Sequence, residues 1–166
     1  MPLLLASSAG CRTLQTAELA GESPGPVTIF MTVEFIDTNI LIYAEDRGMG
    51  AKHQMAVDLV SRLARQHIGA ISTQVLAEYY SAATRKLRMS SEEAEQTIRD
   101  LASWTMHRPS HNDILNAIGL QRRYRLSWWD AMVINSAIAS GAAILWSEDL
   151  TNLQQFGTLV IQNPFI

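Results

Sequence analysis

Two periodicities of apolar residues divide the chain from residue 33 onward. Short apolar runs, rich in residues that favour strands, predict strands at 33–36, 70–71, 104–106, 143–146 and 158–161. Apolar residues three or four positions apart predict helices over 40–45, 52–66, 73–86, 91–103, 111–124 and 128–140, and a short helix near 152–156. Strands that alternate with helices indicate an α/β fold with a mostly parallel sheet and helices on both faces.

Serines mark the starts of the later helices. Ser90 is followed three residues later by Glu93, a capping-box pattern in which each side chain bonds to the other residue's backbone N–H. Ser110 and Ser127 are predicted to cap the next two helices, and Gly141 to end the last of them.

Residues 1–30 show neither periodicity. They are rich in Ala, Ser, Gly, Thr and Pro and include Pro24-Gly25-Pro26. We predict that residues 1–30 are a disordered extension or a start-site artefact, with Met31 as the natural start. Residues 31–166 are then one domain.

Composition and charge narrow the possible functions. The 166 residues are 48% hydrophobic and 17% charged, so most helices are expected to be packed against other elements. A net charge of −3 argues against a generally basic surface for nucleic acids. With four acids in a metal site, however, 13 basic residues face 12 remaining acidic ones, a net of +1, which is compatible with a nucleic-acid substrate.

Cysteine content and apolar run lengths bear on location. Cys11 is the only cysteine, so the chain forms no intrachain disulfide. No apolar run approaches the roughly 18 residues that a membrane helix needs. We therefore expect a cytoplasmic protein that is not inserted in a membrane.

Two acids follow predicted strands. Asp37 ends the first strand, and ligands of open α/β sheets bind beyond the carboxyl ends of strands. Asp149 follows the fourth strand and is preferred to its neighbour Glu148, because Ser147 and Asp149 fall on the same side of an extended segment. Taken singly, each aspartate has a simpler interpretation as a turn or helix-cap residue.

Two further acids lie on predicted helices. Glu78 has no basic residue three or four positions away, so no salt bridge within its helix accounts for it, and a solvated surface position is the alternative. Asp130 lies in a helix that is apolar on nearly every side, where an ionised carboxylate needs a partner, a metal or hydrogen bonds. Its place three residues after Ser127 equally fits a bond to the helix cap.

Taken together, the four acids have a chemical explanation. Two strand ends and two helices deliver Asp37, Glu78, Asp130 and Asp149 to one crevice. Like charges held that close raise each other's pKa unless a cation neutralises them. Oxygen ligands select hard ions such as Mg²⁺ or Mn²⁺, which generate hydroxide and stabilise charge on a phosphate. The residues therefore predict a metal-dependent phosphodiesterase.

Four segments resemble the acidic motifs of the PIN-domain nucleases. They are Phe35-Ile36-Asp37-Thr38-Asn39, Ala77-Glu78, Trp129-Asp130-Ala131 and Ser147-Glu148-Asp149-Leu150. The likeness runs from about Met31 to the C-terminus. It is greatest to the VapC toxins of bacterial toxin–antitoxin pairs, especially over residues 128–165.

The resemblance implies a fold and an activity. The fold is a three-layer α/β/α PIN-like domain with a mostly parallel central sheet. The activity is that of a Mg²⁺- or Mn²⁺-dependent endoribonuclease that cuts RNA and is toxic when free. A cognate antitoxin protein would block the site, and homodimers are the usual assembly.

The resemblance also implies residue roles. By motif, Asp37 and Asp130 hold the metal directly, whereas Glu78 and Asp149 ligate it or orient its waters. Asn39 and Ser147 match supporting polar positions. Many members carry a further acid one turn after the third motif, but this chain has Val133 and Ile134 there, which argues against a fully occupied second metal site.

RNA contacts and the dimer face are predicted more coarsely. The basic residues that are candidates for phosphate contacts are Arg85, Lys86, Arg122 and Arg123. Tyr124 is a candidate for base stacking, and the alternative for both clusters is a solvated helix end. The four tryptophans are predicted to be core or interface residues rather than base platforms. Residues 73–103 are the predicted dimer face.

Two other functions remain open. One is a PIN nuclease in housekeeping RNA processing, with the same chemistry and no antitoxin. The other is an inactive PIN fold that only binds a partner, against which the presence of all four acids argues.

Overall fold

The computed structural model describes residues 32–166. The prediction for residues 1–30 lies outside the described residues. The described chain forms a six-stranded sheet in the order β3-β2-β1-β4-β6-β5. The strands are β1 (Val33–Ile36), β2 (Gly69–Ser72), β3 (Thr105–His107), β4 (Ala142–Trp146), β5 (Gln155–Phe156) and β6 (Leu159–Gln162). Only β5 runs antiparallel to its neighbour, so the predicted, mostly parallel sheet is confirmed.

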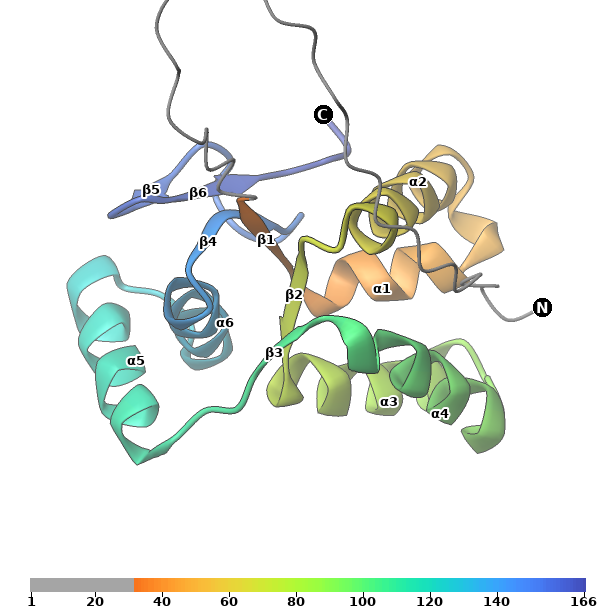
Figure 1. Ribbon diagram of the computed structural model, residues 1–166, viewed down its shortest axis with the longest axis horizontal. Coiled ribbons are helices and arrows are strands. Elements are labelled where there is room, and N and C mark those ends of the chain that lie inside the picture. Colours follow the sequence, from red (N-terminus) through yellow and green to blue (C-terminus); the bar gives the residue numbers. More distant parts are fainter. Residues whose placement is uncertain (1–31) are drawn as a thin grey trace, which may run out of the picture.

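Helices cover both faces of this sheet and make three α/β/α layers (Figure 1). The helices are α1 (Thr38–Glu45), α2 (Ala51–Gln66), α3 (Thr73–Lys86), α4 (Ser91–Asp100), α5 (His111–Tyr124) and α6 (Trp128–Ala139). Helix α1 packs against α2 and α3, and α3 against α4, whereas α5 and α6 pack on each other on the other side. Short 3₁₀ helices at Arg47–Met49 and Leu101–Ser103 complete the connections.

The core lies where the central strands meet α1, α3 and α6. Every residue of β2 is buried, as are seven consecutive residues of α6, 131–137. At the start of β2, a Cβ on Gly69 would lie 2.4 Å from the ring of Trp104, so only glycine lets the indole pack this closely. The apolar character of α6 thus reflects burial on nearly all sides, as the sequence predicts.

One predicted element is wrong. The segment near 152–156 is not a helix, because Gln155–Phe156 is a strand that pairs antiparallel with β6. Gly157 makes the hairpin turn with a φ of +65°, which favours glycine. The buried ring of Phe156 packs edge-on against Tyr124 at 4.8 Å, so a tertiary contact favours the extended form.

The one acid within β1, Glu34, is structural. Glu34 is only 8% exposed, and its carboxylate accepts two hydrogen bonds from Arg62, at 3.0 and 2.7 Å. The indole of Trp146 donates a third at 2.7 Å. This paired arrangement compensates the burial of the charge and explains why a strand interior tolerates a glutamate.

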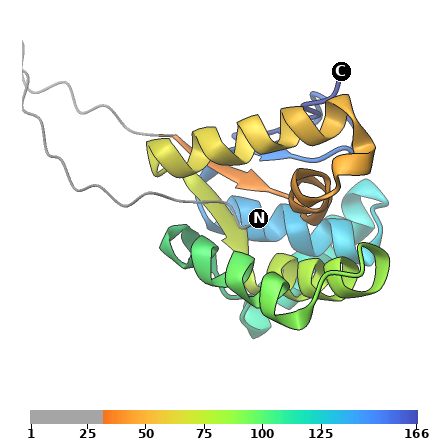
Figure 2. The same ribbon diagram turned by 90° about the vertical axis from the view of Figure 1, so that its right-hand side faces the viewer.

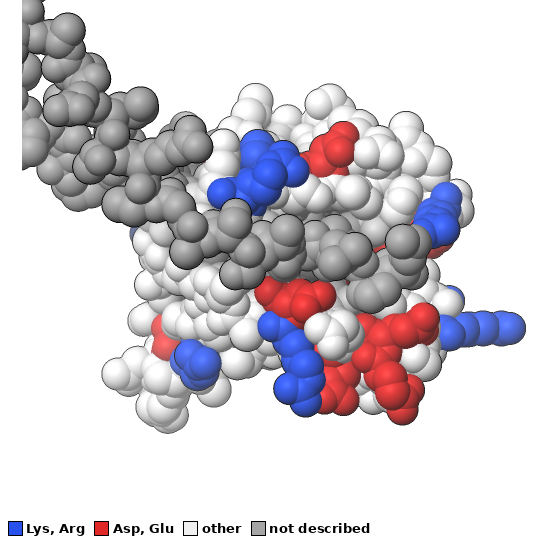
Figure 3. Space-filling view, turned by 45° about the vertical axis from the view of Figure 1, so that its right-hand side comes forward, with Lys and Arg blue, Asp and Glu red and all other residues white. Residues whose placement is uncertain are grey.

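Charge is distributed unevenly over the surface. Figure 3 shows acidic side chains gathered on the lower part of one face, over α4, whose acids are Glu92, Glu93, Glu95 and Asp100. The last turn of the neighbouring α3 carries the basic residues Arg85 and Lys86 instead. Within residues 32–166, no helix has the length and apolarity required to cross a bilayer.

Candidate active site

The sheet topology creates a crevice beside β1. From β1 the chain moves outward through β2 to β3, and it then returns to place β4 on the other side of β1. Strands β1 and β4 are parallel neighbours, so their carboxyl ends lie together. The point between β1 and β4, where the order of the strands reverses, is the usual ligand position in an open α/β sheet. Asp37 follows β1 and Asp149 follows β4 at this edge.

The four predicted acids line one cleft of about 730 Å³. Asp37 and Asp149 reach it from the strand ends, Glu78 from α3 and Asp130 from the first turn of α6. The prediction that two strands and two helices bring these acids together is confirmed. Asp46 also lines this cleft, although its Oδ1 accepts a hydrogen bond from the Gly48 backbone N–H at 2.9 Å.

Asp37 is both a helix cap and a cleft residue, so its two interpretations are compatible. One carboxylate oxygen accepts from the Thr38 backbone N–H at 2.6 Å, and the other accepts from the Ser147 hydroxyl at 2.7 Å. Burial raises the pKa of Asp37 to about 6, although these hydrogen bonds oppose the shift. The nearby charges of Asp149 and Glu78 raise the pKa further.

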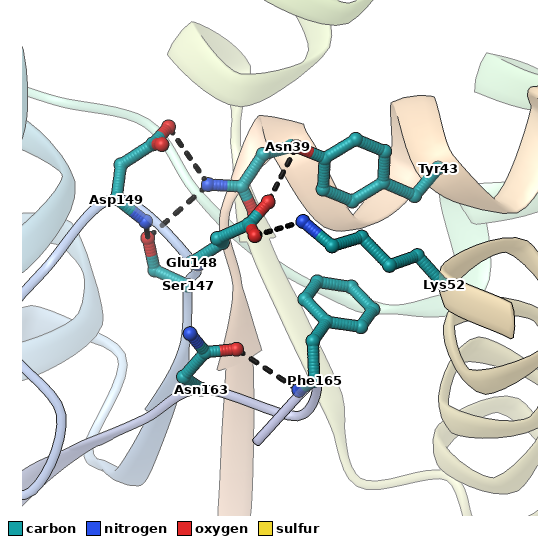
Figure 4. A network of polar contacts seen from close by, with 8 residues as sticks. All are labelled: Asn39, Tyr43, Lys52, Ser147, Glu148, Asp149, Asn163 and Phe165. Atoms are coloured by element: carbon teal, nitrogen blue, oxygen red, sulfur yellow. Dashed lines mark hydrogen bonds and ion pairs between the residues drawn. The ribbon is translucent and has the colours of Figure 1, made fainter. Parts of the chain in front are cut away.

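Asn39 joins the two strand-end acids. Its amide nitrogen lies 3.2 Å from Asp37 Oδ2 and 3.0 Å from Asp149 Oδ2, with Ser147 Oγ at 3.3 Å. Figure 4 shows the amide directed at Asp149 and Ser147. Ser147 is fully buried and also accepts from the Asp149 backbone N–H at 3.2 Å. The two residues predicted to support the site therefore contact its acids directly.

Glu78 is held by neutral partners. The Thr38 hydroxyl donates to Glu78 Oε2 at 3.1 Å, and Gln74 Nε2 donates to Oε1 at 2.8 Å. The surface alternative for this glutamate is wrong, because the residue is half-buried and faces the cleft. A search of the sequence for basic neighbours misses both partners, although Gln74 stands at the expected spacing of four residues.

Asp130 keeps its carboxylate in the cleft. Its backbone N–H donates to the Ser127 hydroxyl at 3.1 Å, so the helix is capped by the serine. Its carboxylate does not make the return bond to Ser127 that would complete a capping box. The local alternative, an acid engaged by its own cap, is therefore wrong for this side chain.

Glu148 and Asp149 point to different partners, which supports the choice of Asp149. Glu148 forms an ion pair with Lys52 and accepts a hydrogen bond from the Tyr43 hydroxyl at 2.5 Å (Figure 4). The bonds from Lys52 and Tyr43 lower the pKa of Glu148, and the hydrogen bond to Glu148 raises the pKa of Tyr43 to about 12. The Phe165 ring stands edge-on to Tyr43 at 5.2 Å (Figure 4). The C-terminal end of the chain lies beside α2 (Figure 2).

Comparison with known protein families agrees with this geometry. The family model described as "PIN domain" matches residues 35–155, which include all four acids. The chain belongs to the PIN-domain family. No curated protein matches it.

Solved structures with the same fold are distant in sequence. A toxin–antitoxin complex from Klebsiella pneumoniae has 21% identity and a TM-score of 0.52, covering 80% of this chain and 98% of that one. The VapBC2 complex from Rickettsia felis, bound to promoter DNA, has 19% identity, a TM-score of 0.58 and the same coverages. Mycobacterium tuberculosis VapC20, a toxin that cleaves the sarcin–ricin loop, has 18% identity and a TM-score of 0.54, covering 68% and 86%.

The acids of this PIN domain fit a hard divalent ion that is only partly enclosed by protein. Among residues 32–166, no three His, Cys, Asp or Glu side chains already lie close enough together to surround one ion. Mg²⁺ typically binds one or two carboxylates and keeps several waters or substrate oxygens, so a complete protein cage is not required. The donor set is all oxygen, and the pKa of Asp37 is raised mainly by burial, with the nearby charges of Asp149 and Glu78 adding to the shift.

The predicted RNA contacts of the PIN domain divide into two groups. Lys86 lines the acidic cleft, and Arg85 lines a groove that adjoins it. Arg122 and Arg123 are exposed at the end of α5 and line neither feature. The structure therefore brings one of the two basic clusters to the acids. Tyr124 is half-buried against Phe156, a packing role rather than the predicted base contact.

Sequence analysis missed one further residue at the cleft. Trp129 is 60% exposed and lines both the acidic cleft and the adjoining groove, whereas the other tryptophans are buried or half-buried. Trp129 is therefore not a core residue, and its predicted place at an interface stays a prediction. Its position directly before Asp130 was the available signal.

Proposed function

We propose that this PIN domain is a metal-dependent endoribonuclease that acts as the toxin of a toxin–antitoxin pair. The observation that carries the proposal is the convergence of Asp37, Glu78, Asp130 and Asp149 on one cleft at the carboxyl ends of β1 and β4. Four carboxylates that line one cleft favour a cation, and the cation favours an anionic substrate.

Asp37 and Asp130 are the proposed direct ligands of Mg²⁺ or Mn²⁺, with Glu78 and Asp149 as ligands or as acceptors for its waters. When bound, such an ion supplies a hydroxide nucleophile near neutral pH and stabilises the charge of the reacting phosphate. Val133, which is 3% exposed, lines the cleft one turn after Asp130. An apolar side chain there supports one fully occupied metal position rather than two.

The other polar residues position these acids. Ser147 and Asn39 hold Asp37 Oδ2, and Asn39 holds Asp149 at the same time. Thr38 connects the first turn of α1 to Glu78 on α3. Asp37, Glu78 and Asp149 therefore have fixed orientations before substrate arrives, which is how a protein lowers the reorganisation needed in a reaction.

RNA is the proposed substrate because the cleft combines an acidic floor with a cationic edge. Lys86 lines the cleft opposite the strand-end acids, where it is suited to contact a backbone phosphate. Arg85 extends this positive edge along α3. The acid-rich surface of α4 is unsuited to the backbone, so the strand is expected to leave the cleft along α3.

The toxin role is inferred from the structural neighbours. One is described as a toxin–antitoxin complex, one as VapBC2 bound to a promoter DNA fragment, and one as a toxin that cleaves the sarcin–ricin loop. A cognate antitoxin is therefore the proposed protein partner, and a homodimer is the proposed assembly.

Induced expression in a bacterial host tests the proposal. We expect growth arrest with the unsubstituted protein and none with Asp37→Asn, which preserves shape and removes a charge that the metal needs. Asp58→Asn is the matched control, because Asp58 is exposed on α2 and lies outside the cleft. Purified protein should cleave cellular RNA in Mg²⁺ or Mn²⁺ but not in a chelator. Equal arrest by all three forms, or cleavage unaffected by chelation, would contradict the proposal.

A further inference from the structure

Trp129 is unusually placed for a tryptophan. It lies in the first turn of α6, a helix otherwise buried from residue 131 onward, yet 60% of its surface is exposed. Its neighbour Trp128 packs against a small cluster that includes Ala117 and Met132. The packing of α6 therefore uses Trp128 and leaves the Trp129 indole free of the core.

The surface beside Trp129 is hollowed. An adjoining groove of about 390 Å³ is lined by Trp129 and by one stripe of α3. Three small residues, Ala77, Ser81 and Ala82, supply part of that stripe at helical spacing. Small side chains opposite an exposed indole leave space for a flat group to lie against the ring. The volume lies within the range of roughly 300–1,000 Å³ found for ligand pockets.

The groove is continuous with the acidic cleft. Glu78, Ala82, Lys86 and Trp129 line both features, so no wall separates them. Arg85 and Lys86 stand in the last turn of α3 and make the far edge of the groove positive. A ligand that fits this groove must therefore have a flat, apolar part and an anionic part. It must also be covalently continuous with the group bound at the four acids.

We propose that this groove is a base-binding subsite in which Trp129 stacks on an unpaired RNA base next to the scissile phosphate. This inference rests on the proposed ribonuclease function. Arg85 and Lys86 contact the phosphate that follows the stacked base. Paired bases do not present a free face, so the subsite selects single-stranded segments such as loops. Trp129 is a positioning residue, because it holds the strand and leaves the chemistry to the acids.

Binding measurements in the full-length Asp37→Asn background separate this subsite from cleavage. The probe is a labelled single-stranded oligoribonucleotide in Mg²⁺. Adding Trp129→Ala should weaken its affinity about tenfold, as expected for loss of one base–aromatic stack. Adding Trp129→Phe should restore most of it. Leu115→Ala is the matched control, because Leu115 is a 53% exposed apolar residue on α5 that lines neither the groove nor the cleft and lies outside the predicted dimer face.

An abasic nucleotide moved along the oligonucleotide tests stacking itself. At one position it should weaken binding when Trp129 is present and have no further effect in Trp129→Ala, because the same contact is then already lost. If Trp129→Ala weakens binding of fully paired RNA as much as binding of the single strand, the proposed subsite is wrong, because fully paired RNA offers no unpaired base to stack on Trp129.

The outcomes distinguish this inference from the proposed function. If Trp129→Ala leaves RNA affinity unchanged while the protein with intact Asp37 still cleaves RNA, the subsite is wrong and the ribonuclease stands. If Trp129→Ala instead abolishes a dimer or antitoxin binding at unchanged RNA affinity, the groove is a protein interface, and the inference is again wrong. If the unsubstituted protein neither binds nor cleaves RNA, both fail.

Discussion

Helices α5 and α6 begin with the same pair of residue types, a serine and an aspartate three positions later, but the two aspartates make different contacts. Ser110 and Asp113 start α5 with a complete capping box, in which the Asp113 carboxylate accepts the Ser110 backbone N–H at 2.8 Å. Ser127 and Asp130 start α6 with only the serine half of this arrangement. Asp113 also accepts from Asn135 at 3.0 Å, whereas Asp130 lines the acidic cleft. One acid stabilises its own helix, and the other faces the cleft.

The pKa values of two acids, Asp113 in its capping box and Asp37 in the cleft, are shifted in opposite directions. Hydrogen bonds from Ser110 and Asn135 lower the pKa of Asp113 to about 2. Burial raises the pKa of the cleft residue Asp37 to about 6. Folding therefore favours the ionised form of Asp113, whereas burial makes the ionised form of Asp37 destabilising.

The largest expected effect is on activity. Asp130→Asn should lower RNA cleavage by at least about 100-fold, beyond the 10- to 100-fold typical of losing a residue that only supports a metal ligand. Asp113→Asn should leave cleavage within about threefold of the unsubstituted rate, because that carboxylate lies outside the cleft. Rates in Mg²⁺ with one RNA substrate measure both. Comparable losses of RNA cleavage in Asp130→Asn and Asp113→Asn would contradict the assignment of Asp130 to the active site and of Asp113 to the helix cap.

The second-largest expected effect is on the free energy of unfolding and its dependence on pH. Ionised Asp37 is buried, so Asp37→Asn should stabilise the metal-free protein by about 2–3 kcal/mol at pH 8. The folded pKa lies above the unfolded value of 3.8, so the penalty is absent below about pH 4 and complete above about pH 6. Thermal melts from pH 4 to pH 8 should show the difference opening over that range. Mg²⁺ or Mn²⁺ should raise the melting temperature only with Asp37 intact.

Asp113→Asn should show the opposite dependence on pH. Loss of the cap bond is expected to destabilise the protein by about 1 kcal/mol at pH 7. The folded pKa of about 2 lies below the unfolded value of 3.8, so this contribution is present above about pH 4 and lost as the pH falls toward 2. Denaturant titrations at pH 7 and pH 3 measure it. A constant difference at both values would show that the carboxylate charge is not involved.

The smallest effect concerns the basic residues at the ends of α3 and α5. Lys86 lines the cleft and Arg122 does not. Lys86→Ala should reduce the salt dependence of RNA binding, lowering the slope of log affinity against log salt by about 0.7, the value for one phosphate contact on a single strand. Arg122→Ala should leave the slope unchanged. Equal reductions would place RNA over both helix ends and enlarge the proposed interface.

The wrong predictions and the correct ones have the same origin, because both use only the spacing of residues within one segment. Periodicity located α2 and α6 because burial of an apolar face repeats along a helix. It failed at 152–156, where Phe156 is held extended by β6 and Tyr124, partners remote from its own segment. Likewise, Glu78 looked like a surface residue because its hydroxyl partner, Thr38, lies 40 positions earlier.

The sequence by itself determined the alternation of strands and helices, the serine caps and the four acids in order, because each depends on residue type and short spacing. The tertiary structure decided how those acids are used. It turned Asp130 toward the cleft while Asp113 capped its helix, and it bound Glu148 to Lys52 while Asp149 faced Asn39. These choices depend on which side chains approach across the sheet edge, and packing of the whole domain sets that proximity.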